Sequence, residues 1–297
     1  MSINIINKGR THKLFIPNKK IILYSKSTNT YKEVLTILFR FYLQTLRKPS
    51  IVLMSLIQPL LWLIMFGGLF QNAPIYLFEE YRIQYKDFLN PGIIIFTAFN
   101  SSINSGLNII FDREFGFLNR VLTSPISNKN SIIYSCTVHT WVIAIAQIVC
   151  ITLMQQNYKN FGSLSNILAQ IITITIVIFN VSQVSICNAF VLPGHIEFIG
   201  LTTIFLNLPT LFASTALAPL SFMPNWLQTI CCINPLTYAI EIIRHYHLGK
   251  NINSNVNILT TTMISINLKQ SFSILLFISL ISFISVKRII KYKYDKN

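Results

Sequence analysis

Charge is scarce in this sequence, and the shortage excludes an ordinary soluble domain. Of its 297 residues, 11% are charged and 52% are hydrophobic, whereas a soluble domain carries roughly 25% charged residues. The composition is that of an integral membrane protein.

The sequence also lacks the motifs of nucleotide and metal chemistry. None of its 10 glycines opens a G-x-x-x-x-G-K-[ST] phosphate loop, so we expect no ATP or Mg site in this chain. Neither H-E-x-x-H nor C-x-x-C occurs, and the five cysteines are read as small apolar residues. We therefore predict neither catalytic residues nor a metal site.

Six uncharged runs are long enough to cross a bilayer, which takes roughly 20 apolar residues in a helix. They cover residues 51–70, 88–110, 131–154, 163–190, 198–219 and 270–286. The predicted fold is all-α, a polytopic membrane protein with six transmembrane helices.

The distribution of positive charge predicts an orientation. Of the 24 Lys and Arg, 18 lie before Ile51, within 111–130 or after Val286, and six spans place these regions on one side. Such an excess marks the cytoplasmic side or its organellar equivalent. The net charge of +15 is thereby accounted for, and no nucleic-acid partner is expected.

A single membrane domain is predicted over residues 31–290. Residues 1–30 are basic and without periodicity, so we expect disorder there, and a basic tail follows at 291–297. No cleavable signal peptide is evident. The heavy use of Ile, Asn and Lys is typical of an AT-rich genome, such as that of a plastid.

An amphipathic helix is predicted just before the first span, in YKEVLTILFRFYLQTLRK at residues 31–48. One sector of its helical wheel is polar and contains Arg40 and Arg47, and the opposite sector is apolar. This pattern beside a span is typical of a helix that lies in the membrane interface. A solvated helix of a small soluble domain is the less favoured alternative, because the chain offers no soluble core for it.

A second amphipathic segment, FDREFGFLNRVLTSP at residues 111–125, carries four charges between two spans. We expect one helix, with Asp112 and Glu114 in its first turn, where acidic groups suit the helix dipole, and with Pro125 ending it. At about 100° per residue, the wheel separates two faces. The apolar face holds Phe111, Phe115, Leu118 and Leu122, and the opposite face holds Arg113 and Arg120.

The second span is unusually polar, with Asn100, Ser101, Ser102, Asn104, Ser105 and Asn108. Such residues bond neighbouring helices or line a hydrated path, and the sequence leaves both interpretations open.

The uncharged stretch 198–240 is about twice one span and is interrupted by four prolines. We predict a fifth span followed by short re-entrant segments on the outer side. NPLTYAIEIIRHYHLG, residues 234–249, predicts an outer amphipathic helix with Asn234 as N-cap and Pro235 at the first helical position. Glu241 and Arg244 share its polar face, and whether they bond each other stays open.

Both segments resemble motifs of a known family. FDREFGFLNRVLTSPIS resembles the segment after the second span of type-2 ATP-binding-cassette exporter permeases, especially the drug-resistance-like branch. INPLTYAIEIIR resembles the segment before the last span of that family. The resemblance covers roughly residues 31–290 and implies a homodimer of permeases with two copies of a separate ATP-binding subunit, which holds ATP and Mg.

The resemblance also implies roles for individual residues. The contact that couples the chain to the ATPase would be formed or shaped by Asp112, Arg113, Glu114, Gly116, Arg120 and Pro125. Arg40 and Arg47 would lie on membrane lipid beside it. The outer end of the path would be capped by Asn234, Pro235, Tyr238, Glu241 and Arg244. Some members carry an acidic residue where Asn119 stands, so no role is carried over to that position.

The function expected from this resemblance is the membrane subunit of an ATP-driven exporter. The few charges in the spans favour a lipid-like or amphipathic substrate over a multiply charged one. The expected location is a plastid membrane, with a bacterial inner membrane as the alternative. An assembly or anchoring factor without transport activity is a second class. A channel or secondary carrier is a third, disfavoured because almost nothing ionisable lies at mid-membrane.

Overall fold

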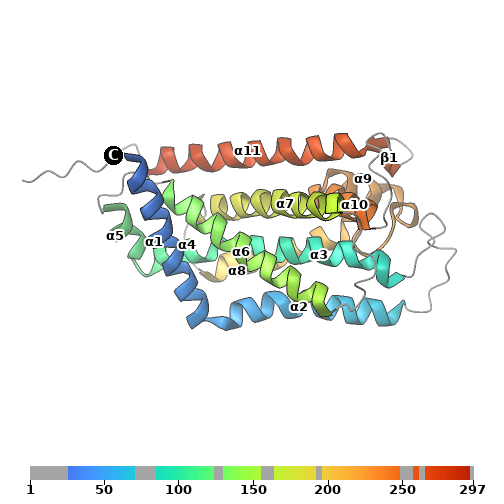
Figure 1. Cartoon of the computed structure of the whole chain (residues 1–297), viewed down its shortest axis with the longest axis horizontal. Coiled ribbons are helices and arrows are strands. Elements are labelled where there is room, and N and C mark those ends of the chain that lie inside the picture. Colours follow the sequence, from blue (N-terminus) through green and yellow to red (C-terminus); the bar gives the residue numbers. More distant parts are fainter. Residues whose placement is uncertain are drawn as a thin grey trace, which may run out of the picture.

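The computed structural model describes residues 26–70, 85–123, 130–154, 164–191, 196–247, 257–260 and 265–294. Five helical segments in this part are long and apolar enough to cross a membrane. They are α2 (Pro49–Leu69), α3 (Tyr85–Ile103) continued by α4 (Leu107–Glu114), α6 (Ser131–Met154), α7 (Leu164–Val191) and α11 (Leu268–Tyr294). Four of them run along the long axis of the bundle, and α6 crosses it obliquely (Figure 1).

The predicted fifth span corresponds to α8 (Ile196–Phe212), which has 17 residues and contains Pro209. It is shorter than the roughly 20 residues that a crossing takes. The described residues therefore contain five helices long and apolar enough to cross a membrane where the sequence predicts six, and α8 stands in the place of the predicted fifth span.

Short elements follow α8 and gather at one end of the bundle (Figure 1). They are the 3-10 turn η3 (Leu220–Phe222), α9 (Asn225–Ile233), α10 (Pro235–His247), β1 (Asn257–Thr260) and β2 (Ser265–Asn267). The two strands pair antiparallel, with Leu259 opposite Ile266. This small hairpin is a departure from the predicted all-α fold.

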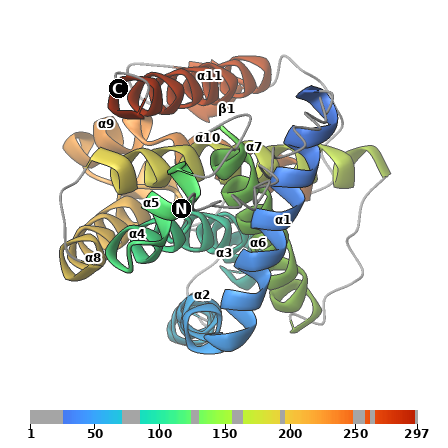
Figure 2. The same ribbon diagram turned by 90° about the vertical axis from the view of Figure 1, so that its left-hand side faces the viewer.

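The opposite end carries the N-terminal helix α1 (Lys26–Arg47), α4 and α5 (Phe117–Thr123). There α1 crosses the other helices instead of running beside them (Figures 1 and 2). Its outward face exposes Tyr31, Leu35, Phe39, Leu43 and Leu46. An exposed apolar stripe on a crossing helix is the geometry of an interfacial helix. Helix α1 begins five residues before the predicted domain start, and the rest of the predicted disordered segment, 1–25, lies outside the described residues.

Helix α3 forms the centre of the bundle, because 78% of its most apolar window is buried, against 11% for α2. It contacts α2, α6, α7 and α10. Gly92 permits a further close approach, to the segment between α8 and η3, since a Cβ there would lie 2.6 Å from the carbonyl oxygen of Ala216. The central helix is thus held on several sides before the chain reaches α4.

The break between α3 and α4 is stabilised by α7. The Ser185 hydroxyl donates to the carbonyl of Ile103 at 2.6 Å and accepts from the N–H of Gly106 at 2.9 Å. One side chain therefore replaces helical hydrogen bonds that the break removes, as backbone at membrane depth requires.

Candidate functional site

The FDREFGFLNRVLTSP segment forms two helices, not the single helix that the sequence predicts. Gly116 adopts a left-handed conformation, with φ of 70°, and separates α4 from α5. The Gly116 N–H bonds the Arg113 carbonyl at 3.1 Å, as in a glycine-terminated helix. Gly116 therefore shapes the segment by turning the chain, and Pro125 lies outside the described residues.

The predicted placement of Asp112 and Glu114 in a first helical turn is wrong. Both lie in the last turn of α4, which starts at Leu107. The apolar stripe is also divided, because Leu118 is 2% exposed whereas Phe115 is 74% exposed. The helical wheel treated the segment as one continuous helix, whereas the turn at Gly116 rotates α5 relative to α4.

Asp112 is buried and paired with Arg40 of α1. Arg40 Nη1 donates to Asp112 Oδ1 at 2.8 Å, and Nη2 bonds Oδ2. The Arg40 guanidinium also lies 4.2 Å from the ring centroid of Phe117. Such two-pronged pairing fixes both position and orientation. Arg40, expected on lipid, instead joins α1 to α4 and α5.

Arg113 anchors the same segment to α7. Its Nη1 donates to the carbonyl oxygen of Ala189 at 2.8 Å, near the C-terminal end of α7, where a cation favours the helix dipole. Arg113 and Asp112 therefore hold α4 in place from two sides. Neither side chain is available as a fully exposed contact for another protein.

Other side chains of α4 and α5 point away from the bundle. Glu114, Phe115, Asn119 and Arg120 are exposed, and we call these four the α4–α5 face. Arg47 is also exposed, at the end of α1. The sequence predicted Phe115 only as part of an apolar stripe. Its exposure depends on the turn at Gly116, which the helical wheel did not include.

At the outer end, the structure brings Glu241 and Arg244 together. Arg244 Nη1 bonds Glu241 Oε1, Nη2 donates to the Thr215 carbonyl at 2.7 Å, and the guanidinium lies 3.8 Å from the Phe88 ring centroid. Both side chains are buried, Arg244 at 1% exposure. The alternative that Glu241 and Arg244 lie exposed on the helix surface is therefore wrong.

Helix α10 is buried on both faces, from Leu236 to Tyr246, which differs from the amphipathic surface helix that the sequence predicts.

The start of α10 agrees with the prediction: Asn234 Oδ1 accepts from the Leu236 N–H at 3.0 Å, and Pro235 begins the helix. Asn234 Nδ2 also bonds the Ala213 carbonyl at 2.7 Å. The Tyr238 hydroxyl donates to the Cys232 carbonyl at 2.5 Å, so these residues fasten α10 to α9 and to the end of α8.

The polar residues of the second span bond neighbouring helices, and four of them also face a cavity. Asn100 bonds the Ser55 carbonyl at 3.1 Å and accepts from Asn207 at 3.0 Å, so it connects α3 to α2 and α8. Ser101, Asn104, Ser105 and Asn108 line a cavity.

These features define a helical, multi-pass membrane protein with an N-terminal helix across one end of the bundle and short helices at both ends. Residues 32–248 match the family described as "ABC-2 type transporter". The chain belongs to the ABC-2 type transporter permease family, as the resemblance implies.

Relatives with known names agree. The chain is 42% identical over 261 residues, 88% of this chain and 89% of the relative, to a protein of Porphyra purpurea named as a candidate transport permease, ycf38. A protein of the same name in Pyropia yezoensis is 42% identical over 92% of this chain and 93% of its own length. The daunorubicin resistance ABC transporter permease protein DrrB1 of Streptomyces coeruleorubidus is 24% identical, over 72% of this chain and 75% of its own.

The ycf38 relatives are encoded in plastid genomes. This agrees with the plastid membrane expected from the composition, and the likeness to DrrB1 agrees with the drug-resistance-like branch.

Proposed function

We propose that this chain is the membrane subunit of an exporter powered by ATP, and that a separate ABC ATP-binding subunit docks on the α4–α5 face. The observation that carries the proposal is the exposure of Glu114, Phe115 and Arg120 on two short helices that are fastened from behind. In this chain the sequence contains no phosphate loop, so ATP and Mg are assigned to the partner.

The contacts behind the α4–α5 face support its use as a lever. Asp112 joins α4 to α1 through Arg40, and Arg113 joins α4 to α7. The break at Gly106 separates α4 from the central helix α3. A push on the face would therefore be passed to α1 and α7, and the break would let α4 tilt relative to α3.

The transported substrate is proposed to be amphipathic or lipid-like. Asn100 and Asn207 are polar but uncharged and meet between α3 and α8. A pathway for a multiply charged cargo would need ionisable groups at mid-membrane, which are costly and functional where they occur. A homodimer is proposed as well, since α2 leaves Leu53, Ile57, Leu61 and Ile64 exposed to lipid or to a second copy.

The test is to purify the protein from its native membrane in mild detergent and to identify the chains that remain bound by mass spectrometry. A stoichiometric subunit with a phosphate loop, whose ATPase rate depends on the permease, is the expected result. Arg120→Glu combined with Glu114→Lys should abolish the association. Lys269→Glu, an exposed charge change at the outer end of α11, is the matched control and should leave it intact.

The same preparation separates the other two classes. A carrier or channel would show flux without ATP in reconstituted vesicles and would be unaffected by the double variant. An assembly factor would lose its partner in the double variant but would have no ATP-dependent flux to lose. Recovery of no ATPase with the intact protein would contradict the exporter.

A further inference from the structure

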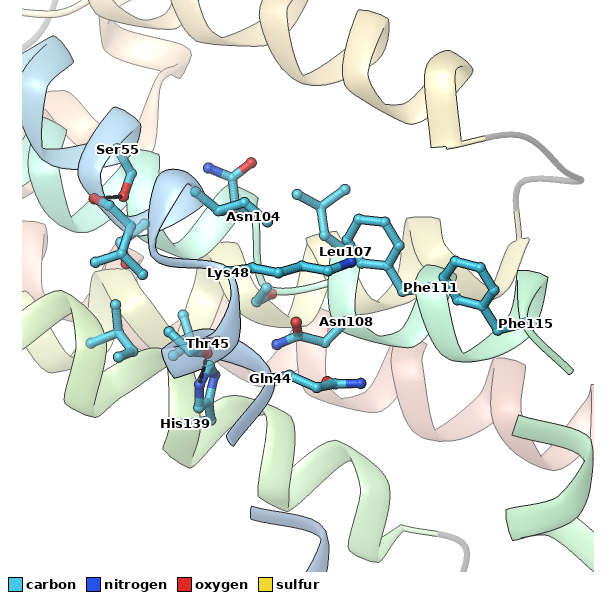
Figure 3. A pocket seen from close by; sticks show the side chains of 16 residues that line it. Gln44, Thr45, Lys48, Ser55, Asn104, Leu107, Asn108, Phe111, Phe115 and His139 are labelled. Atoms are coloured by element: carbon cyan, nitrogen blue, oxygen red, sulfur yellow. Dashed lines mark hydrogen bonds between the residues drawn. The ribbon is translucent and has the colours of Figure 1, made fainter. Parts of the chain in front are cut away.

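A cavity of about 250 Å³ lies within one copy of the chain, near the α1 end of the bundle. Its walls come from the elbow between α1 and α2, the break between α3 and α4, and the facing side of α6 (Figure 3). Among the described residues that line it, Lys48 supplies a positive charge and no carboxylate is present. The formal charge of the described lining is therefore positive.

Lys48 lines this space with an exposed side chain. Its Nζ lies 4.4 Å from the ring centroid of Phe111, a distance at which the ring face attracts an ammonium group. Figure 3 shows the Lys48 side chain extended toward Phe111, with Asn108 and Gln44 beside it. An anion placed there would meet an ammonium group and the amide donor of Asn108.

The Gln44 side chain carries a buried hydrogen-bond acceptor. Its Nε2 donates to Asp112 Oδ1 at 3.4 Å, which fixes the orientation of the amide because a carboxylate accepts. Its Oε1 is buried and has no hydrogen-bond partner among the described residues. A buried acceptor of this kind is costly unless a ligand or water donates to it. Gln44 lines the cavity, and a small turn of its side chain would offer this acceptor to a hydroxyl group close to the anion.

The cavity continues toward the lipid-facing side of α2. A neighbouring hollow shares Ile51, Ser55, Asn104 and Leu107 with it and extends to Met54, which is 69% exposed. Beyond Met54 the exposed surface of α2 is apolar. A molecule with a polar, anionic end and apolar chains therefore fits the two hollows better than a free anion does.

We propose that this cavity binds the headgroup of an anionic, hydroxyl-bearing membrane lipid, with its acyl chains along α2. The anionic group pairs with Lys48 and Asn108, and a headgroup hydroxyl donates to Gln44 Oε1. The site lies inside one copy and does not rest on the proposed transport. Because it bridges α1, α2 and α4, a bound headgroup joins the interfacial helix to the α4–α5 segment.

The test is native mass spectrometry of the purified chain titrated with phosphatidylglycerol, with phosphatidylcholine of the same acyl chains, and with glycerol 1-phosphate. The expected result is one phosphatidylglycerol per chain, bound more tightly than either other ligand. Lys48→Gln and Asn108→Leu should each weaken binding about tenfold, as expected for loss of a charge-assisted or amide contact. Arg47→Gln removes an equal charge one residue away, outside the cavity, and should change binding little.

Three results would overturn the proposal or part of it. Equal binding of phosphatidylglycerol and phosphatidylcholine, or equal effects of the Lys48 and Arg47 variants, would indicate surface attraction alone. Equally tight binding of glycerol 1-phosphate would reject the lipid and leave an anion site. Unchanged phosphatidylglycerol binding by Asn108→Leu would show that the headgroup does not lie in the cavity. Gel filtration of each variant shows that a loss is not due to misfolding.

Discussion

Arg40 and Asp112 are 72 residues apart in the sequence, and their side chains form a two-pronged ion pair between α1 and α4. The pair is enclosed by Gln44 and by the ring of Phe117. This contact decides how the α4–α5 face is presented, because it fixes the end of α4 from which α5 turns away.

The first prediction concerns this pair. Asp112→Asn should lower the free energy of unfolding by about 1–3 kcal/mol, because it leaves the Arg40 guanidinium without its carboxylate partner. Thermal unfolding in detergent measures the loss. Arg40→Lys keeps the charge but loses the fork and the stacking on Phe117, so its loss should be smaller but not zero. Equal stability of all three proteins would mean that the pair is not formed.

The second prediction concerns Gly116. Gly116→Ala should destabilise the protein by about 1 kcal/mol, since its φ of 70° is unfavourable for a residue with a Cβ. Gly67→Ala is the control: it lies inside α2 with nothing within 4 Å of the added Cβ, so it should be neutral or stabilising. Chemical denaturation compares the two. A loss of stability in Gly67→Ala as large as that in Gly116→Ala would contradict the left-handed turn at Gly116.

The third prediction concerns the buried pair at the outer end. Arg244→Met should cost about 3–5 kcal/mol, because it leaves the Glu241 carboxylate buried and uncompensated. Adding Glu241→Gln in the same chain should recover much of that loss. Unfolding midpoints of the single and double variants measure the coupling. If the double variant is no more stable than Arg244→Met, the two side chains do not act as a pair.

The fourth prediction is a pH dependence at the outer end of α10. Burial lowers the pKa of His247 below its usual 6.5, although Asp87 opposes the shift. The folded state therefore binds this proton less readily than the unfolded state, so stability should fall as the pH drops below about 6.5. His247→Gln should flatten this part of the pH profile of thermal unfolding. An unchanged profile would assign the acid sensitivity to other groups.

Much of the fold follows from apolar runs alone. The positions of α2, α3, α6, α7 and α11 agree with the uncharged stretches, because crossing a bilayer imposes length and composition on each segment by itself. The short α8 was harder to predict, since hydropathy continues past Phe212 while the helix stops there. Apolarity sets which residues avoid water but not where a buried helix ends.

The sequence placed the site residues on helices but did not predict their contacts. The wheel placed Arg40 on the polar face of its helix, and only packing brings Asp112 within 2.8 Å of it. A helix end at Gly116 was available from the glycine itself, which favours left-handed turns. Similarly, Glu241 and Arg244 were recognised as neighbours, but their burial depends on Phe88 and Thr215, which come from distant segments.

The central claim is that the α4–α5 face contacts a separate ATPase. The most direct measurement places a photo-crosslinking amino acid at Phe115 or Arg120 in the native membrane and identifies the attached chain by mass spectrometry. Trp226, which is 66% exposed at the outer end, is the matched control position. The account predicts a chain with a phosphate loop at 115 and 120 but not at 226. No such chain at 115 or 120, or an equal yield at 226, would contradict it.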